Sequence, residues 1–215
     1  MRYKAIIFDM DGVLCFTDKY HYRAWKQMAD KIDVYFDEKI NNRLRGVSRM
    51  ESLNIILKKA DKEYSEQEKE QLADSKNEIY KKLLMNMTSE DFSREVRDTL
   101  DLLRSRGYKL AIGSSSKNAK LILKQVGLQD YFDKISDGTN ITKSKPDPEV
   151  FLKAAEYLNV KPEECLVVED AKAGINAACA GGFDSVGIGE ASGYEKTTYS
   201  IAHFSQLANL DKLKR

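Results

Sequence analysis

Four short apolar runs of strand length recur along the chain, at residues 5–8, 109–113, 165–168 and 185–188. After residue 90, helical patterns or loops separate these runs. A continuous apolar run without alternation is typical of a strand that is buried on both faces of a parallel sheet. The pattern therefore predicts an α/β domain with a mostly parallel sheet.

A long block between the first and second runs has a different pattern. Apolar residues such as Leu53, Ile56 and Leu57 recur there at spacings of three and four, with dense charges between them. Helices are expected at residues 19–31, 48–60 and 65–87, and no strand pattern interrupts them. We therefore predict a doubly wound, Rossmann-like core at 1–14 and 93–215, with an inserted all-helical cap domain at 15–92.

Two loops follow predicted strands and lead into predicted helices. Residues 114–116, which are all serine, precede a helix from about residue 117, and Glu169 with Asp170 precede a helix at 171–180. Doubly wound sheets bind ligands outside the carboxyl ends of their strands. The side chains of these loops are therefore the first candidates for chemistry.

Composition and charge exclude several functional classes. The chain has 215 residues with 35 Lys and Arg against 34 Asp and Glu, and this balance argues against a nucleic-acid binder or a polybasic membrane-surface protein. Three cysteines without C-x-x-C spacing indicate neither a disulfide framework nor a zinc site, which fits a reducing cytoplasm. No apolar stretch approaches bilayer length, and dinucleotide and P-loop fingerprints are missing from the sequence.

Carboxylates gather after two of the predicted strands. Asp9 and Asp11, two residues apart after the first strand, can serve one reacting centre as nucleophile and as acid and base, although Asp-Gly is also common in turns. Glu169 and Asp170 can join Asp9 in holding a hard cation, for which Mg²⁺ is expected. The alternative for Asp170 is a helix N-cap.

Two further segments are suited to a phosphate. Ser114-Ser115-Ser116-Lys117-Asn118 offers hydroxyls, backbone N–H groups and a cation at a helix start, although serines there are often caps. Lys145 precedes Pro146 in a stiffened loop, where its ammonium can neutralise phosphoryl charge. The alternative for Lys145 is a solvated surface group.

The order of these motifs resembles the haloacid-dehalogenase-like superfamily: an Asp-x-Asp after the first strand, then a Ser, a Lys-Pro and an acidic pair, each in its own loop. Within it, the chain is similar to the β-phosphoglucomutase family at residues 8–14, 17, 20–26, 45–49, 76–77, 114–118, 145–146 and 169–175. The similarity extends over both predicted domains to about residue 189.

This resemblance implies a phosphoryl-transfer isomerase for β-glucose 1-phosphate and glucose 6-phosphate, working through a sugar bisphosphate. Asp9 would become the aspartyl phosphate, and Asp11 would act as acid and base. The resemblance also implies the ligands of Mg²⁺ and of the transferring phosphoryl group. Mg²⁺ would be held by Asp9, the Asp11 carbonyl, Glu169 and Asp170, and the phosphoryl oxygens by Ser114 and Lys145.

The resemblance implies a separate set of contacts to the sugar and to its second phosphate. Arg49 would bind that phosphate, although its position after Ser48 also fits a solvated residue at a helix start. Further substrate or phosphate contacts are expected from Thr17, His21, Trp25, Gly46, Lys76, Ser115, Ser116, Lys117 and Asn118. By residue type alone, Trp25 is expected to be a packing residue and His21 to be packed or solvated.

Two departures from the family lie at the predicted hinges. Phe16-Thr17 stands where an Asp-Thr pair is expected, and Arg94-Glu95 stands where the family commonly has a Pro-Gly turn. We expect a cytoplasmic monomer that binds a phosphosugar, with no nucleic-acid or membrane partner. Two alternatives stay open: a sugar-phosphate phosphatase on the same scaffold, and a non-catalytic module that binds phosphorylated ligands.

Overall fold

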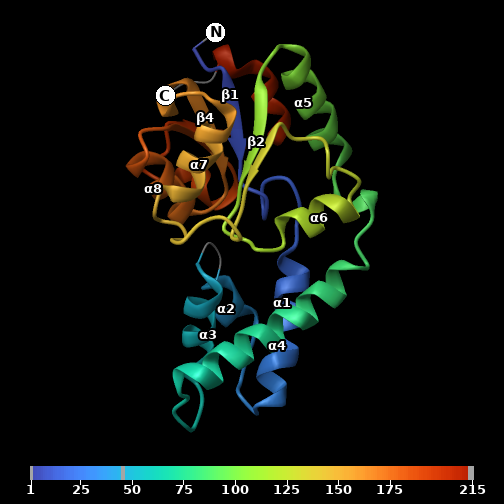
Figure 1. The fold of residues 1–215 in the computed structure, drawn as a ribbon, viewed down its shortest axis with the longest axis vertical. Helices are drawn as coiled ribbons and strands as arrows, with labels where there is room; N and C mark the ends of the chain where they lie inside the picture. Colours follow the sequence, from blue (N-terminus) through green and yellow to red (C-terminus); the bar gives the residue numbers. More distant parts are fainter. Residues whose placement is uncertain (1, 45–46, 213–215) are drawn as a thin grey trace. The chain divides into compact units, whose positions relative to one another are not determined.

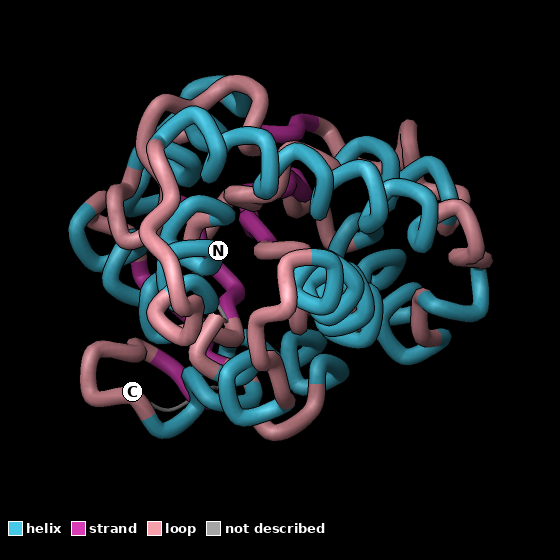
Figure 2. The backbone as a smooth tube through the Cα atoms, turned by 90° about the horizontal axis from the view of Figure 1, so that it is seen from below, coloured by secondary structure: helices cyan, strands magenta, loops and turns pink. Residues whose placement is uncertain are grey.

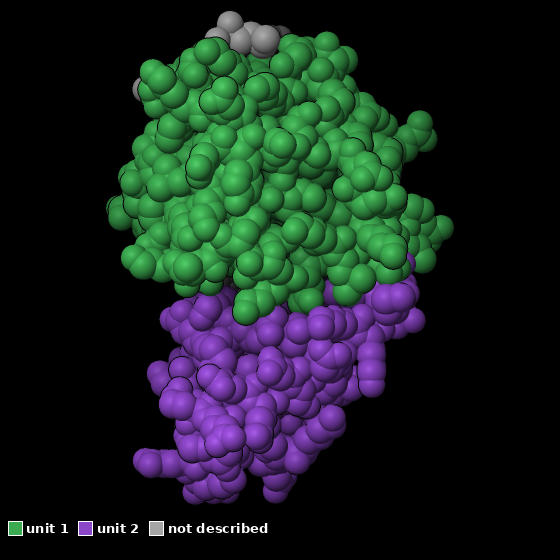
Figure 3. All heavy atoms as spheres, viewed as in Figure 1, with its two compact units in different colours: residues 1–16, 88–215 green, residues 17–87 purple. Residues whose placement is uncertain are grey.

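The computed structural model of the protein describes residues 2–44 and 47–212. The chain divides into two compact units, which Figure 3 colours separately: unit 1 comprises Met1–Phe16 and Thr88–Arg215, and unit 2 comprises Thr17–Met87. No helix in the described part of the chain is long and apolar enough to cross a membrane.

A six-stranded parallel sheet forms the centre of unit 1, in the order β3-β2-β1-β4-β5-β6 (Figure 1). The strands are β1 Ala5–Phe8, β2 Lys109–Gly113, β3 Lys134–Ser136, β4 Cys165–Glu169, β5 Asp184–Gly187 and β6 Tyr199–Ser200. Phe8 at the end of β1 is in register with Ile112 of β2 and Val168 of β4. The loops that follow these three strands therefore begin side by side at one edge of the sheet.

Helices cover both faces of this sheet. They are α5 Arg94–Ser105, α6 Ala119–Gln125, α7 Glu149–Leu158 and α8 Lys172–Ala180, with short 3-10 segments at Ser89–Asp91, Pro162–Glu164, Gly189–Gly193 and Phe204–Lys212. Ile7 of β1 packs in a core cluster with residues of α7 and α8, whereas its neighbour Phe8 contacts the rings of Phe132 and Phe204. Successive residues of a strand point to opposite faces of the sheet, so Ile7 and Phe8 pack against elements on different faces. Coverage of both faces confirms the predicted doubly wound α/β fold.

The described residues of unit 2 form four helices: α1 Asp18–Lys31, α2 Glu38–Asn42, α3 Arg49–Leu57 and α4 Glu66–Leu84. Strands (magenta in Figure 2) occur only in unit 1 among the described residues. Side-chain caps start three helices, since Asp37, Ser48 and Ser65 accept hydrogen bonds from backbone N–H groups of the first turn. Leu53 and Ile56 of α3 are fully buried in the core of this unit, as their helical spacing predicts.

The boundaries differ from the sequence-based ones by a few residues. The predicted cap edges were 15 and 92, but Cys15 belongs to unit 1 because its N–H donates to the Met10 carbonyl and its carbonyl accepts from Gly12 N–H. Arg94 and Glu95 are the first residues of α5, capped by Ser93, and not a turn. The helices expected at 48–60 and 65–87 end earlier, at Leu57 and Leu84.

Candidate active site

Asp9 lies at the sheet edge directly after Phe8 and is buried. Its backbone N–H donates to the Val168 carbonyl of β4 over 2.9 Å, which fixes the loop between two strands. Gly12 follows with φ of +84°, and a Cβ there would lie 2.0 Å from Oδ2 of Asp170. The turn thus explains why a glycine stands at position 12, but it does not explain why the Asp9 carboxylate is buried.

Asp11 lies between these two residues in a tight backbone turn. Gly12 N–H donates to the Cys15 carbonyl over 2.8 Å, and Cys15 N–H donates to the Met10 carbonyl over 3.1 Å. Asp11 pairs with Cys15 in an isolated bridge and is half-buried. The turn therefore fixes the backbone from which Asp11 extends, two residues after Asp9.

The Lys145 ammonium contacts two carboxylates at this edge of the sheet, those of Asp9 and Glu169. Its Nζ lies 2.5 Å from Oδ1 of Asp9 and 2.8 Å from Oε2 of Glu169, and 4.6 Å from the centre of the Phe151 ring. Burial alone would lower the pKa of Lys145, but the charges of Asp9 and Glu169 outweigh it and hold the pKa above its ordinary value. The alternative of a solvated surface lysine is therefore wrong.

The third carboxylate of the cluster, Asp170, follows Glu169 at the end of β4. Oxygens of Asp9, Glu169 and Asp170 lie within 4.8 Å of one another. Burial and the charge of Asp9 raise the pKa of Glu169 to about 7, and burial with the charges of Glu169 and Asp9 raises that of Asp170 to about 9. The N-cap of α8 is Ala171, so the capping interpretation of Asp170 is wrong.

The serine loop after β2 bends through two short side-chain turns. Oγ of Ser114 accepts from Ser116 N–H over 3.1 Å, and Oγ of Ser116 accepts from Asn118 N–H over 3.2 Å. Asn118, and not a serine, is the N-cap of α6, so simple helix capping does not account for the serines. Ser114 is 2% exposed and lies one residue beyond the sheet.

The same loop is joined to the segment that carries Lys145. Oγ of Ser115 accepts from Lys145 N–H over 3.3 Å. Gly138 N–H donates to the Ser116 carbonyl, and a Cβ on Gly138 would lie 2.4 Å from the Ser115 carbonyl oxygen. Lys117 is exposed. Hydrogen bonds of the backbone and of the Ser115 hydroxyl therefore hold the serine loop beside the loop that carries Lys145.

In unit 2, His21 and Lys76 form a close pair. Nδ1 of His21 lies 3.0 Å from Nζ of Lys76, and the imidazole packs 4.1 Å from the ring of Tyr80. Lys76 is 3% exposed, with its ammonium over the rings of Trp25 and Tyr80. Burial, followed by the charges of Lys76 and Arg49, holds the pKa of His21 well below its usual range. His21 is therefore neutral at neutral pH.

Arg49 begins α3, immediately after its N-cap. Oγ of Ser48 accepts from Glu51 N–H over 3.2 Å, and an Arg49 guanidinium nitrogen lies 4.0 Å from a carboxylate oxygen of Asp74. The side chain of Asp74 is 82% exposed, so this long contact restrains Arg49 weakly. The segment thus starts a helix, as expected, whereas the Arg49 side chain is 25% exposed and is not a fully solvated residue.

The remaining candidates of unit 2 have different surroundings. Thr17 is buried immediately before α1, and its carbonyl accepts from Tyr20 and His21 N–H groups. Trp25 is buried in the helical core, as its residue type predicts. Gly46 lies outside the described residues.

Comparisons with known proteins agree with this arrangement. Residues 3–182 match the model of the haloacid dehalogenase-like hydrolase family. The chain belongs to this family. It is 43% identical to a β-phosphoglucomutase of Bacillus subtilis over 87% of this chain and 84% of the relative, and 32% identical to a phosphorylated carbohydrates phosphatase of Thermotoga maritima over 85% and 83%. A crystal structure of β-phosphoglucomutase from Clostridium difficile has a TM-score of 0.88 and 40% identity, covering 95% of this chain and 93% of that one.

The acidic cluster of this haloacid dehalogenase-like hydrolase fits a divalent cation. Asp9, Glu169 and Asp170 offer oxygen ligands, which Mg²⁺ prefers. Burial first, and then the neighbouring carboxylates, raise the pKa values of Glu169 and Asp170, and a cation at this place would stabilise their charged forms. Lys145 offsets only part of the negative charge.

Two residues that support the site are not recognisable from their residue type. Gly174 lies in the first turn of α8, where a Cβ would lie 2.0 Å from Cδ of Glu169, so only glycine lets the helix approach this carboxylate. Glu149 binds the segment before Lys145 through several hydrogen bonds. For Glu149 the sequence offers one local signal, an acidic residue three positions after Pro146 at a helix start.

Proposed function

We propose that the protein interconverts β-glucose 1-phosphate and glucose 6-phosphate through a phosphorylated Asp9 and a sugar bisphosphate. The observation that carries this proposal is the buried carboxylate of Asp9 with the Lys145 ammonium at 2.5 Å, beside two further carboxylates. The similarity to the Bacillus subtilis and Clostridium difficile β-phosphoglucomutases supports the choice of reaction.

In the proposed reaction, a carboxylate oxygen of Asp9 attacks the phosphorus of the bisphosphate, and the bond between phosphorus and the sugar oxygen breaks. Asp11 donates a proton to that leaving oxygen. In the reverse transfer, the other sugar hydroxyl attacks the aspartyl phosphate while Asp11 accepts its proton. The hydroxyl of Ser114 and the ammonium of Lys145 hold the phosphoryl oxygens throughout.

A bound Mg²⁺ would reduce the repulsion between the phosphoryl group and the carboxylates. Asp9, Glu169, Asp170 and the backbone carbonyl of Asp11 are the proposed ligands. The raised pKa values of Glu169 and Asp170 support this assignment, because burial and neighbouring negative charge disfavour their ionised forms, which a bound cation would stabilise.

The phosphate that is not transferred requires its own contacts, and we assign the guanidinium of Arg49 to it. Ser116, Lys117 and Asn118 are further proposed phosphate contacts. The proposed contacts to the rest of the substrate are Thr17, His21, Trp25, Gly46, Lys76 and Ser115.

A sugar-phosphate phosphatase is the second candidate function, favoured by the 32% identity to the phosphatase of Thermotoga maritima. In that reaction, water attacks the aspartyl phosphate and inorganic phosphate leaves. The two candidates share the first step and differ in the acceptor. Measuring both glucose 6-phosphate and released phosphate therefore separates them.

The decisive experiment is a coupled assay for glucose 6-phosphate from β-glucose 1-phosphate, with Mg²⁺ and a trace of the bisphosphate. We expect Asp9→Asn to abolish turnover and leave the fold intact, because an amide is nearly isosteric and cannot attack phosphorus. Turnover close to that of the wild type in this variant would exclude Asp9 as the nucleophile. The proposal further includes a monomer. It also includes a location in the cytoplasm, which the free thiols of Cys15, Cys165 and Cys179 fit.

A further inference from the structure

The segment between β3 and α7 carries Lys145 but contains no strand or helix (residues 137–148). A lysine side chain has four rotatable bonds, so the position of its ammonium depends on how firmly its backbone is held. Lys145 must reach Asp9 and Glu169 at 2.5 and 2.8 Å. The structure must therefore restrain this segment by contacts other than regular hydrogen-bonded elements.

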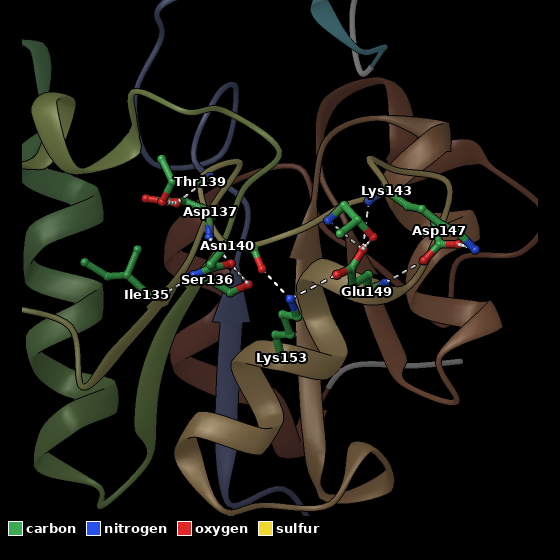
Figure 4. A network of polar contacts seen from close by, with 10 residues as sticks. Ile135, Ser136, Asp137, Thr139, Asn140, Lys143, Asp147, Glu149 and Lys153 are labelled. Carbon is green, nitrogen blue, oxygen red and sulfur yellow. Dashed lines mark hydrogen bonds and ion pairs between the residues drawn. The ribbon is translucent and has the colours of Figure 1, made fainter.

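One carboxylate supplies several of these restraints. Oε2 of Glu149, at the start of α7, accepts from Thr142 N–H, from Lys143 N–H and from the Thr142 hydroxyl over 2.9, 2.7 and 2.9 Å (Figure 4). Its other oxygen, Oε1, lies 3.0 Å from Nζ of Lys153 one turn along the helix. These contacts lower the pKa of Glu149 to about 2, the largest cause being the Lys143 N–H, so the carboxylate stays charged.

The same network reaches the end of β3. Lys153 donates to the backbone carbonyl of Asn140, as Figure 4 shows. The side-chain oxygen of Asn140 accepts from the Ser136 hydroxyl and from Asp137 N–H over 3.2 and 3.3 Å. The segment before Lys145 is thus held to β3 at one end and to α7 at the other.

Hydrogen bonds also restrain the end of the segment that follows Lys145. Oδ1 of Asp147 accepts from Glu149 N–H over 3.0 Å, and Asp147 N–H donates to the Ser144 carbonyl over 3.1 Å. Lys145 lies between the two restrained stretches, and its own N–H donates to Ser115 of the serine loop. Loss of the Glu149 carboxylate would release three hydrogen bonds on the two residues that lie two and three positions before Lys145.

We propose that Glu149 is a positioning residue, which holds the segment before Lys145 and thereby places its ammonium beside Asp9. This inference rests on the proposed function, because it assigns Glu149 to the phosphoryl transfer at Asp9. Glu149 touches no reacting atom in this scheme. Its effect passes through the backbone of Thr142 and Lys143 to the lysine.

The test compares Glu149→Ala and Glu149→Gln with the wild type and with Glu156→Ala, a control at an exposed glutamate on the same helix. In each Mg²⁺-loaded protein, intact-mass spectrometry follows the rate at which acetyl phosphate phosphorylates Asp9. Hydrogen exchange reports the backbone of residues 141–147, and the coupled assay gives kcat and KM.

For Glu149→Ala we expect labelling and kcat to fall by about tenfold to hundredfold, because displacement of a catalytic group by about 1 Å costs up to that factor. Exchange in residues 141–147 should become faster, while KM changes little. Glu149→Gln keeps one oxygen for the two backbone N–H groups and should recover most of the rate. Glu156→Ala should match the wild type in every measurement.

A Glu149→Ala protein that is labelled at the wild-type rate, or a loss that Glu156→Ala shares, would overturn the inference. If Glu149→Ala does not fold, Lys153→Ala takes its place, with the same direction of change expected and an unchanged labelling rate again overturning the inference. Wild-type protein that is labelled at Asp9 but forms no glucose 6-phosphate would refute the proposed mutase function alone.

Discussion

The ammonium of Lys145 lies 2.5 Å from Oδ1 of Asp9, and both side chains are buried. A lysine in this position neutralises a carboxylate that would otherwise be costly to bury. Glu169 takes a second contact from the same ammonium, while Asp170 has a strongly raised pKa. Among the described residues, Lys145 is the cation that contacts Asp9 and Glu169, and Asp170 is the third carboxylate of the cluster, so the stability of the site depends on protons and metal ions.

Replacement of Lys145 should destabilise the metal-free protein. We expect Lys145→Ala to lower the free energy of unfolding by about 3–5 kcal/mol, because it leaves the Asp9 and Glu169 carboxylates buried without their partner. Urea denaturation with a chelator present measures this loss, and added Mg²⁺ should restore part of it. Lys143→Ala is the control, since Lys143 is exposed and its ion pair with Asp147 contributes little. Equal unfolding midpoints for the two variants would contradict the prediction.

The acidic cluster also predicts an unusual pH dependence of stability. Because the folded state raises the pKa of Glu169 from 4.5 to about 7, folded protein binds more protons than unfolded protein between these values. The free energy of unfolding of metal-free protein should therefore fall as pH rises from about 4.5 to 7, by up to about 1.4 kcal/mol per unit of pKa difference. Urea titrations across this range test the slope, which saturating Mg²⁺ should reverse. Glu169→Gln should make the slope shallower, while Asp170, whose pKa is also raised, keeps part of it, and a metal-free wild type that gains stability with pH would refute the assignment.

A single methyl group at Gly174 should disturb the metal site without weakening the helix. The added Cβ would overlap Glu169 and displace its carboxylate, while alanine itself favours a helix by about 1 kcal/mol over glycine. We expect Gly174→Ala to fold and to require at least about tenfold more Mg²⁺ for half-maximal turnover. Gly193→Ala, at a position where a Cβ meets nothing within 4 Å, is the control. An unchanged Mg²⁺ requirement would show that the added methyl group does not displace the Glu169 carboxylate.

Sequence patterns predicted the four strands that are buried along most of their length and missed the two other strands of the described sheet. β1, β2, β4 and β5 are recognisable as apolar runs, because helices cover both of their faces. β3, with the sequence Lys134-Ile135-Ser136, has one apolar residue, and β6 has two residues in all. Their pairing depends on neighbouring strands that are distant in sequence, so no local pattern could indicate them.

The candidate site shows the same division between local and long-range information. Asp9, Ser114, Lys145 and Glu169 were predicted because each lies in a short motif, and the motifs come in a recognisable order. Gly174 lies within the stretch 169–175 that resembles the family, but its role could not be predicted, because it arises from the distance between α8 and a carboxylate on β4.

The pairing of His21 with Lys76 predicts a measurable pKa change. Burial lowers the pKa of His21 first, and the nearby charge of Lys76 lowers it further. Lys76→Met should therefore raise the pKa of His21, although burial still holds it below the ordinary value. NMR titration of the imidazole signals, assigned with a His203→Gln variant, measures the pKa of His21 in the wild type and in Lys76→Met. A titration of His21 that Lys76→Met leaves unchanged would mean that the ammonium is not beside the imidazole in solution.

The last prediction distinguishes the mutase from the phosphatase. If Arg49 binds the phosphate that is not transferred, Arg49→Ala removes a charge-assisted contact worth on the order of 2–4 kcal/mol. The mutase rate should then fall by about two to three powers of ten, since each 1.4 kcal/mol corresponds to a factor of ten. Phosphorylation of Asp9 by acetyl phosphate, which carries no second phosphate, should change much less.

Both rates should be measured in one preparation, with Arg23→Ala as a control at an exposed arginine of α1. Equal losses in the two assays would mean that Arg49 supports the fold and not a phosphate contact. An unchanged mutase rate would mean that the second phosphate is bound elsewhere. Only a large loss of mutase activity with nearly intact labelling fits a guanidinium that recognises the bisphosphate, because a phosphatase that transfers phosphate to water has no need of that contact.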